Sequence, residues 1–177
     1  AEGRIGMERD IDELDGIVGQ FIDYVRDGRD EPLQTVDLVS MLQTLGAHEA
    51  RQGREWRLGL PGSARLHGRP LALRRALTNL FDNAARHGAA PFEAELDAIE
   101  DGWRLRVFDR GPGVPETALA ELGRPFHRVD GARSTPGSGL GLASVARIAV
   151  VHGGELRLHN REGGGLVVEL FIGVLPR

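Results

Sequence analysis

The 177-residue chain contains no cysteine, which removes several kinds of chemistry. Disulfides, thiol nucleophiles and thiolate metal sites are all excluded. Lysine is absent as well, so all 22 basic residues are arginine. The chain therefore has no P-loop lysine, no strand lysine of the eukaryotic protein-kinase type and no lysine for Schiff-base chemistry.

Long apolar runs and an excess of positive charge are also missing. No apolar run approaches the roughly 20 residues that span a bilayer, and the start shows no signal-peptide pattern. The net charge of −4 argues against a nucleic-acid-binding protein, because such a protein would rely on a broad basic face. Because the sequence begins inside a helix-like pattern, we expect a fragment excised from a longer parent.

An apolar stripe marks the first residues. Its members are spaced 4-3-4-3-4, which is typical of the seam of a helical bundle. They are Met7, Ile11, Leu14, Val18, Phe21 and Val25. Such a helix needs partners to bury its face, unless it lies on its own domain. We therefore expect a partial dimerisation helix at 1–28, a linker at 29–34 and one domain at 35–177.

The domain alternates strands with helices. The patterns predict strands at 35–37, 56–60, 64–66, 92–99, 103–108, 155–158 and 166–172 and helices at 38–50, 69–87, 116–122 and 140–152. Two pairs, at 92–108 and 155–172, resemble antiparallel hairpins. This order indicates an α+β fold with helices on one face of a sheet.

Two asparagines, Asn79 and Asn83, lie one turn apart on an otherwise apolar helix. An amide oxygen suits Mg²⁺, which needs few protein ligands because it keeps waters and substrate phosphates. Alternatively, both bond to backbone or solvent, although asparagine is a poor helix former. Arg86, one turn later, can reach a terminal phosphate. His87 either stacks on a purine or ends the helix together with Gly88.

Asp109 follows the strand at 103–108 and begins the sequence Asp-Arg-Gly-Pro-Gly. Its carboxylate can accept a hydrogen bond from an exocyclic amino group such as that of adenine. Gly111 and Gly113 let the backbone approach a base closely. An ordinary Asp/Gly/Pro turn is the alternative.

A third glycine-rich motif precedes the helix at 140–152. It reads Gly137-Ser138-Gly139-Leu140-Gly141-Leu142, and free amides at a helix start bind phosphate. A dinucleotide fingerprint is excluded because position 142 is leucine and no strand precedes the motif.

The loop before this motif is locally basic. It holds Arg124, His127, Arg128 and Arg133. These charges favour a triphosphate near the loop, unless they belong to an ordinary solvated loop.

Together the motifs resemble the ATP-binding domain of sensor histidine kinases of two-component systems. Residues 79–84 resemble the N box, Asp109 to Gly113 the G1 box, Pro125-Phe126 the F box and 137–142 the G2 box. The first helix is similar to the second dimerisation helix of EnvZ-like kinases. The resemblance covers essentially the whole chain.

This resemblance implies the Bergerat (GHKL) fold, a two-layer α/β sandwich preceded by one long amphipathic helix. Its mixed, mostly antiparallel sheet carries helices on one face. ATP and Mg²⁺ are the implied ligands, beneath a mobile lid at about 115–137 anchored by Phe126. By motif match, Asn83 holds Mg²⁺, Asp109 reads the adenine amino group, Arg86 contacts phosphate and His87 lies near the base. The other implied ATP-binding residues are Asn79, Gly111, Gly113, Phe126, Gly137, Ser138, Gly139, Leu140, Gly141 and Leu142, and the implied catalytic residues are Asn79, Arg86, Arg128 and Arg133.

The implied function is transfer of the ATP γ-phosphoryl group to a histidine, then to a response-regulator aspartate. Catalysis would rest on positioning and charge stabilisation. The implied partners are the histidine-bearing dimerisation helix, a response regulator and a second parent copy. The chain would be the cytoplasmic domain of a bacterial inner-membrane protein. None of its six histidines lies in a His-Glu/Asp-x-x-x-Pro setting, so it should not autophosphorylate alone.

Hydrolytic relatives of this fold carry a glutamate, the general base for water, one turn before the magnesium asparagine. Here that position is Asn79, which cannot take a proton, so transfer is favoured over hydrolysis. An ATPase of the same fold and a non-catalytic nucleotide-sensing dimerisation module remain alternatives. The glycine run at 163–165 lacks the Gly-Thr often found there and receives no role.

Overall fold

The computed structural model describes residues 18–127 and 139–175, except positions 20, 23 and 174. Most of the predicted dimerisation helix lies outside these residues, as do Arg128, Arg133, Gly137 and Ser138 of the predicted site. The described positions between 18 and 25 are helical. The predicted domain boundaries stay a prediction.

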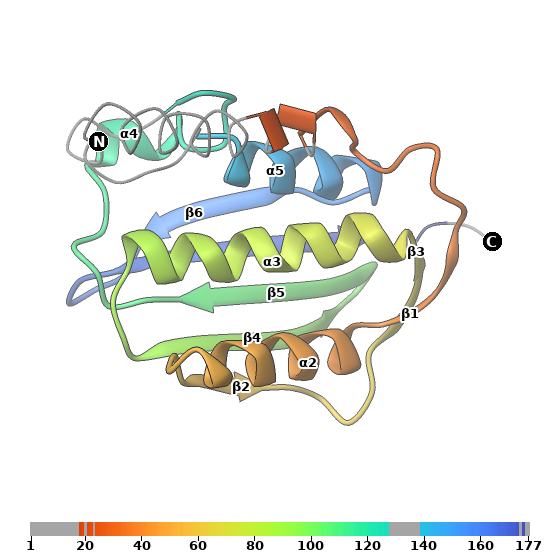
Figure 1. Ribbon diagram of the computed structural model, residues 1–177, viewed down its shortest axis with the longest axis horizontal. Coiled ribbons are helices and arrows are strands. Elements are labelled where there is room, and N and C mark those ends of the chain that lie inside the picture. Colours follow the sequence, from red (N-terminus) through yellow and green to blue (C-terminus); the bar gives the residue numbers. More distant parts are fainter. Residues whose placement is uncertain (1–17, 20, 23, 128–138, 174, 176–177) are drawn as a thin grey trace, which may run out of the picture.

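The described elements follow the predicted order (Figure 1). They are β1 (Gln34–Asp37), α2 (Leu38–Arg51), β2 (Trp56–Gly59), β3 (Arg65–Gly68), α3 (Pro70–His87), β4 (Phe92–Ile99), β5 (Gly102–Phe108), α4 (Glu116–Leu119), α5 (Gly141–Val151), β6 (Leu156–Asn160) and β7 (Leu166–Gly173). The main differences are that α4 is one turn shorter than predicted and that β3 and β6 each extend two residues further. Beyond Leu119 the chain forms i→i+3 turns, such as Arg124 N to Glu121 O, instead of continuing the helix.

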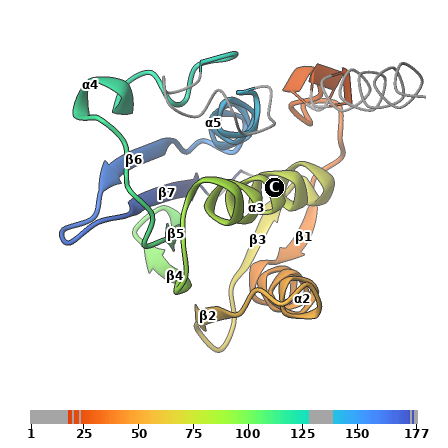
Figure 2. The same ribbon diagram turned by 60° about the vertical axis from the view of Figure 1, so that its left-hand side comes forward.

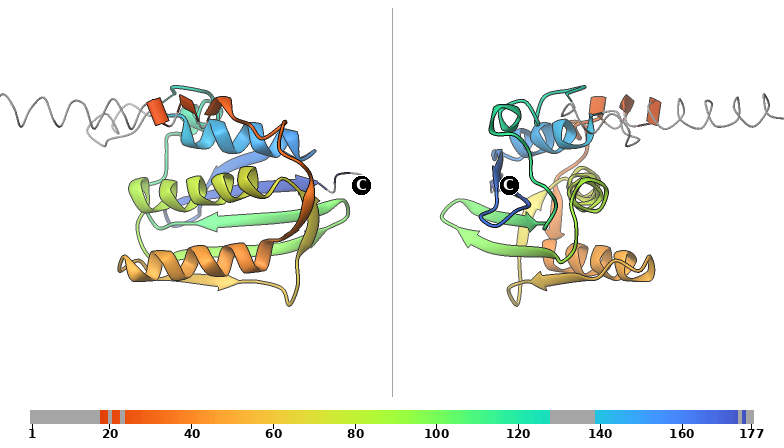
Figure 3. Two further views of the ribbon diagram at one scale, coloured as in Figure 1. Left: turned by 45° about the vertical axis from the view of Figure 1, so that its right-hand side comes forward. Right: turned by 90° about the vertical axis from the view of Figure 1, so that its left-hand side faces the viewer.

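Five strands form the main sheet in the order β2-β4-β5-β7-β6. β2 pairs with β4 in parallel and the other neighbours are antiparallel, while β1 and β3 form a separate two-stranded sheet. Helix α3 lies between α2 and α5 (Figure 2), and these three helices cover one face of the main sheet (Figure 3). The predicted two-layer, mostly antiparallel architecture is confirmed.

The core lies between this face and the helices. Helix α3 contributes its apolar face, in which Leu73, Leu77, Leu80 and Phe81 are fully buried. The ring of Trp56 on β2 stacks on Phe81 at a centroid distance of 3.8 Å. This packing fixes the rotation of α3, so that its polar residues face away from the sheet.

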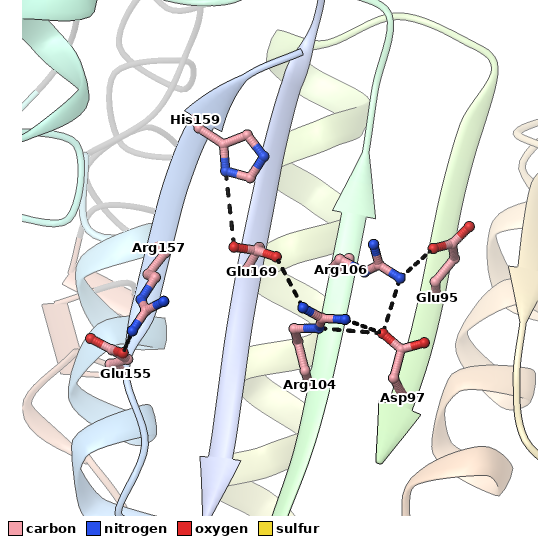
Figure 4. A network of polar contacts seen from close by, with 8 residues as sticks. All are labelled: Glu95, Asp97, Arg104, Arg106, Glu155, Arg157, His159 and Glu169. Carbon is pink, nitrogen blue, oxygen red and sulfur yellow. Dashed lines mark hydrogen bonds and ion pairs between the residues drawn. The ribbon is translucent and has the colours of Figure 1, made fainter. Parts of the chain in front are cut away.

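The opposite face of the sheet is covered by charged side chains (Figure 4). Asp97 pairs across the strands with Arg104, and Glu95 with Arg106, at distances of 3.1 and 2.9 Å. Opposite charges directly across antiparallel strands are favourable, and such a face is typical of a sheet solvated on one side. None of the described helices is long and apolar enough to cross a bilayer.

The segment before β1 contacts the domain both at the end of the predicted dimerisation helix and in the predicted linker. The side chain of Asp27 accepts a 2.8 Å hydrogen bond from Arg147 on α5. The carboxylate of Glu31 accepts from the amides of Leu71 and Ala72, at 2.7 and 3.0 Å. Because Arg69 provides no side-chain cap for α3, Glu31 satisfies amides that the helix leaves open.

A fully buried histidine joins the same ends of α3 and α5. Nε2 of His152 accepts a 3.1 Å hydrogen bond from the amide of Arg69, and Nδ1 donates to the carbonyl of Ile148 at 2.8 Å. An amide can only donate and a carbonyl can only accept, so the ring must be neutral with its proton on Nδ1. Burial lowers the pKa of His152, which agrees with this neutral form.

Candidate functional site

The first predicted motif lies on the C-terminal half of α3. Asn79 and Asn83 are half-buried, and Arg86 and His87 are exposed. Nδ2 of Asn79 donates a 3.4 Å hydrogen bond to the carbonyl of Gly141, the first residue of α5. The structure thus brings together two motifs that are 62 positions apart.

Asn83 and Arg86 differ from Asn79 in their bonding. Within the described parts of the chain, neither side chain makes a hydrogen bond or an ion pair. Both are therefore available to a ligand, as the predicted roles of Asn83 toward Mg²⁺ and of Arg86 toward phosphate require.

Asp82 is the only carboxylate in the asparagine motif. Burial raises its pKa, although the positive charges of Arg86 and Arg54 oppose the rise. Glu49 on α2, whose carboxylate binds Arg54 at 2.6 Å, adds to the increase. Asp82 therefore belongs to a charge cluster shared with α2 and does not occupy the position, one turn before Asn83, where a general base for hydrolysis is expected.

Asp109 lies directly after β5 and is only 5% exposed. Its Oδ1 accepts a 2.7 Å hydrogen bond from the amide of Gly111. No described residue donates to Oδ2, so one carboxylate oxygen can still accept a hydrogen bond from a ligand. This is the arrangement that reading an exocyclic amino group requires.

Glycines allow the loop after β5 to pack against the end of α3. A Cβ atom on Gly88 would lie 2.4 Å from Cγ of Asp109, and one on Gly111 would lie 2.7 Å from Cα of Gly88. The amide of Arg110 donates to the carbonyl of Ala89 at 2.8 Å. From the sequence, Gly88 was assigned only to the end of the helix, but its lack of a side chain also leaves space for Asp109.

The described part of the third motif begins at Gly139, which has a φ of 72°. Leu140 and Leu142 are buried in the core, with exposed fractions of 1% and 7%. Their predicted contact with a nucleotide could therefore involve only backbone atoms. A Cβ atom on Gly141 would meet nothing within 4 Å, and the N-cap residue of α5, Leu140, provides no side-chain cap.

The basic loop is described only up to His127. Arg124 forms a 2.8 Å ion pair with Glu121, so part of its charge is neutralised locally. Phe126 has a φ of 61° and is 61% exposed. The predicted anchoring of a lid by Phe126 is therefore not visible as a packed side chain.

A groove of about 470 Å³ lies between α4, α5 and β6. Its lining includes Leu119, Gly123, Ala146, Leu158 and Glu169. None of the residues predicted to bind a nucleotide lines it, so this groove is separate from the predicted site.

Residues 68–175 match the family described as histidine kinase-, DNA gyrase B-, and HSP90-like ATPase. The chain belongs to this family. Sensor histidine kinase GtrS of Pseudomonas aeruginosa is 39% identical over 166 residues, covering 92% of this chain and 34% of GtrS. Sensor protein QseC of Escherichia coli is 37% identical over 146 residues, covering 81% of this chain and 31% of QseC. The chain thus spans about a third of the length of these relatives.

Solved structures agree with this family. The mycobacterial sensor histidine kinase MprB gives a TM-score of 0.70 at 29% identity, covering 81% of this chain and 100% of that structure. The histidine kinase domain of the Escherichia coli osmosensor EnvZ gives 0.65 at 35% identity, covering 85% and 94%. The chain is therefore an ATP-binding catalytic domain of the sensor histidine kinase type, and the resemblance found in the sequence is confirmed.

Within this ATP-binding domain, the described residues contain no cluster of three His, Asp or Glu side chains that could hold a metal ion. A metal that is also coordinated by nucleotide phosphates needs no such cluster. The unbonded amide of Asn83 and the open space beside Gly141 fit a metal–nucleotide complex of that kind.

Proposed function

We propose that the parent protein transfers the γ-phosphoryl group of Mg-ATP to a histidine on its dimerisation helix, and from there to an aspartate of a response regulator. The main support is the bond from Asn79 to Gly141, which joins the asparagine motif to the glycine motif. In addition, Asn79 has an amide at the position where hydrolytic relatives carry a base. An amide cannot accept a proton from water at neutral pH, so the site favours a protein nucleophile over hydrolysis.

Four of the predicted residues have distinct parts in this proposal. Asn83 ligates Mg²⁺ through its amide oxygen, and Oδ2 of Asp109 accepts from the adenine amino group. Arg86 binds a phosphate oxygen, and His87 lies near the base. Bound Mg²⁺ would supply charge neutralisation of the phosphates.

The implied partners follow from the same proposal. Val18, Phe21, Ile22 and Val25 are each about half exposed on the described part of the first helix. An apolar face of this kind supports pairing with the histidine-bearing helix and with a second parent copy. The domain would lie on the cytoplasmic side of an inner-membrane parent.

The test restores the missing acceptor. The chain is incubated with labelled ATP and Mg²⁺, with and without a histidine-bearing dimerisation helix supplied in cis or as a separate chain. We expect an acid-labile phosphoprotein only when the acceptor helix is present. Steady phosphate release without an acceptor would instead favour an ATPase, and ATP binding without labelling of the histidine would favour a nucleotide-sensing module.

A further inference from the structure

Asn160, the last residue of β6, holds the backbone of Val114 through its side-chain amide. The amide of Val114 donates to Oδ1 at 2.9 Å, and Nδ2 donates to the carbonyl of Val114 at 2.7 Å. One side chain therefore satisfies both polar backbone groups of a residue 46 positions away. The loop from Asp109 to Gly113 follows β5, and Val114 is the first residue after this loop.

The contact of Asn160 extends to both sides of Val114. Nδ2 also donates to Oε1 of Glu116 on α4 at 3.0 Å. On the other side, a Cβ atom on Gly113 would lie 2.7 Å from Oδ1, and Gly113 has a φ of 70°. Any side chain at position 113 would therefore be strained and would collide with the amide of Asn160.

The turn after Asn160 holds the opposite end of the same loop. A Cβ atom on Gly165 would lie 2.1 Å from the carbonyl oxygen of Asp109. The amide of Asp109 donates to the carbonyl of Leu166 at 3.2 Å. The segment from Asn160 to Leu166 thus supports both ends of the Asp109–Gly113 loop. This segment contains the glycine run at 163–165, which received no role in the sequence analysis.

We propose that Asn160 is a positioning residue for nucleotide binding: it fixes Val114 and thereby sets the distance of the Asp109–Gly113 loop from the base. This inference rests on the proposed function, because it takes that loop as the adenine-facing wall. Asn160 acts through the backbone of Val114 and makes no contact with the nucleotide in this arrangement.

The decisive variant is Asn160→Asp, which has the same shape. It keeps an acceptor for the amide of Val114 but replaces the donor with an oxygen that faces the carbonyl of Val114 and the carboxylate of Glu116. We expect the affinities for ATP and for ADP, measured by calorimetry, to fall by the same factor of about ten, corresponding to about 1.4 kcal/mol. Equal losses are expected because the loop faces the base, which both nucleotides share.

Two further variants separate this role from general stability. Glu116→Gln alone keeps an oxygen for Nδ2 and should bind ATP like the wild type. Combined with Asn160→Asp, it offers an amide donor to the new carboxylate and should recover part of the lost affinity. His159→Ala, on the same strand but 53% exposed in its side chain, is the matched control and should bind normally.

The outcomes distinguish the two proposals. If the wild-type chain binds no ATP, the proposed function fails before Asn160 is tested. If wild type binds and folded Asn160→Asp binds ATP within about twofold of it, the positioning role is wrong. A loss for ATP without a loss for ADP also overturns it, because the effect would then lie at the phosphates. Asn160→Ser, which is too short to reach Val114, replaces Asn160→Asp if urea unfolding shows that the latter does not fold.

Discussion

The two ends of the helix pair α3 and α5 differ in how their polar groups are satisfied. At the linker end, Glu31 caps the first amides of α3, and fully buried His152 bonds both Arg69 and Ile148. At the other end, Asn83 and Arg86 make no bond with any described residue, and a Cβ atom on Gly141 would meet nothing within 4 Å. The polar groups of the first end are bonded within the domain, whereas Asn83 and Arg86 at the second end have no such partner among the described residues.

The contrast has a physical reason. Buried amides and carbonyls without partners destabilise a fold, so a purely structural helix end is capped. A helix end that binds an anion must leave its amides and nearby side chains unpaired until the ligand arrives. Substitutions at the end with Asn83 and Arg86 should therefore change nucleotide binding with little effect on stability. Substitutions at the end with Glu31 and His152 should lower stability with little effect on binding.

The largest effect is expected for Asn83→Ala at the open end. Loss of the only proposed protein ligand of Mg²⁺ should reduce Mg²⁺-dependent ATP affinity by well over tenfold, which is more than about 1.4 kcal/mol. Stability should change little, because the amide makes no bond among the described residues and alanine favours helix. Calorimetry with and without Mg²⁺ tests this, with Arg74→Ala on the same helix as control. Unchanged affinity would rule out the magnesium assignment.

Asp109→Asn should have the next largest effect, on base selectivity. The variant keeps an acceptor for the amide of Gly111 but turns the other oxygen into a donor, which cannot accept from adenine and can donate to the guanine carbonyl. The preference for ATP over GTP should fall about tenfold or more, since a mispaired buried polar group costs about 1–3 kcal/mol. Competition binding of the two nucleotides measures it. The same selectivity in wild type and variant would contradict the adenine-reading role.

Glu31→Ala tests the capped end. Loss of both bonds to the first turn of α3 should lower the free energy of unfolding by about 1–2 kcal/mol. ATP affinity should stay unchanged, because Glu31 lies at the opposite end of the helix. Urea unfolding followed by tryptophan fluorescence measures stability, and exposed Glu162→Ala serves as control. If the Glu31→Ala variant lost ATP affinity but not stability, the assignment of this helix end to stability would be wrong.

The smallest expected effect is the pH dependence due to His152. Burial lowers its pKa in the folded state, whereas the unfolded chain should titrate near the usual value of about 6.5. Below about pH 6.5 the unfolded state therefore binds more protons, and stability falls as the pH decreases. Urea unfolding between pH 7.5 and 5.5 should show this slope, and His152→Gln should reduce it while lowering stability at every pH. An identical slope in the variant would assign the pH dependence to other groups.

Much of the fold could be predicted because its signals are local. The apolar face of α3 and the alternation in β4 and β5 follow from residues within one window of sequence. The end of α4 was predicted less well, since Leu119 is followed by i→i+3 turns that resemble helix in composition. The asparagine and glycine motifs also identified the family, because residue types at fixed spacing encode ligand chemistry.

The docked linker could not be predicted from Gly28 to Pro32, which read as an ordinary break. Glu31 reaches the amide of Leu71 across 40 positions, and Asp27 reaches Arg147 across 120. The pKa of Asp27 shows the result: burial raises it, but the hydrogen bond from Arg147 and the amide of Arg29 outweigh burial and hold it below its usual value. Contacts across such long sequence separations leave no periodic pattern in the sequence from which they could be predicted.

The sequence by itself determined the strands and helices, the chemical identity of the motifs and the amide in place of a base at Asn79. Only the tertiary structure decided which groups meet: Asn79 with Gly141, Gly88 with Asp109, and Asn160 with Val114. The reason is that hydrogen bonding within a helix or strand depends on neighbouring residues, whereas these contacts join segments that only the packing of helices on the sheet brings together. That packing makes separate motifs into one candidate site and supports its loop from behind.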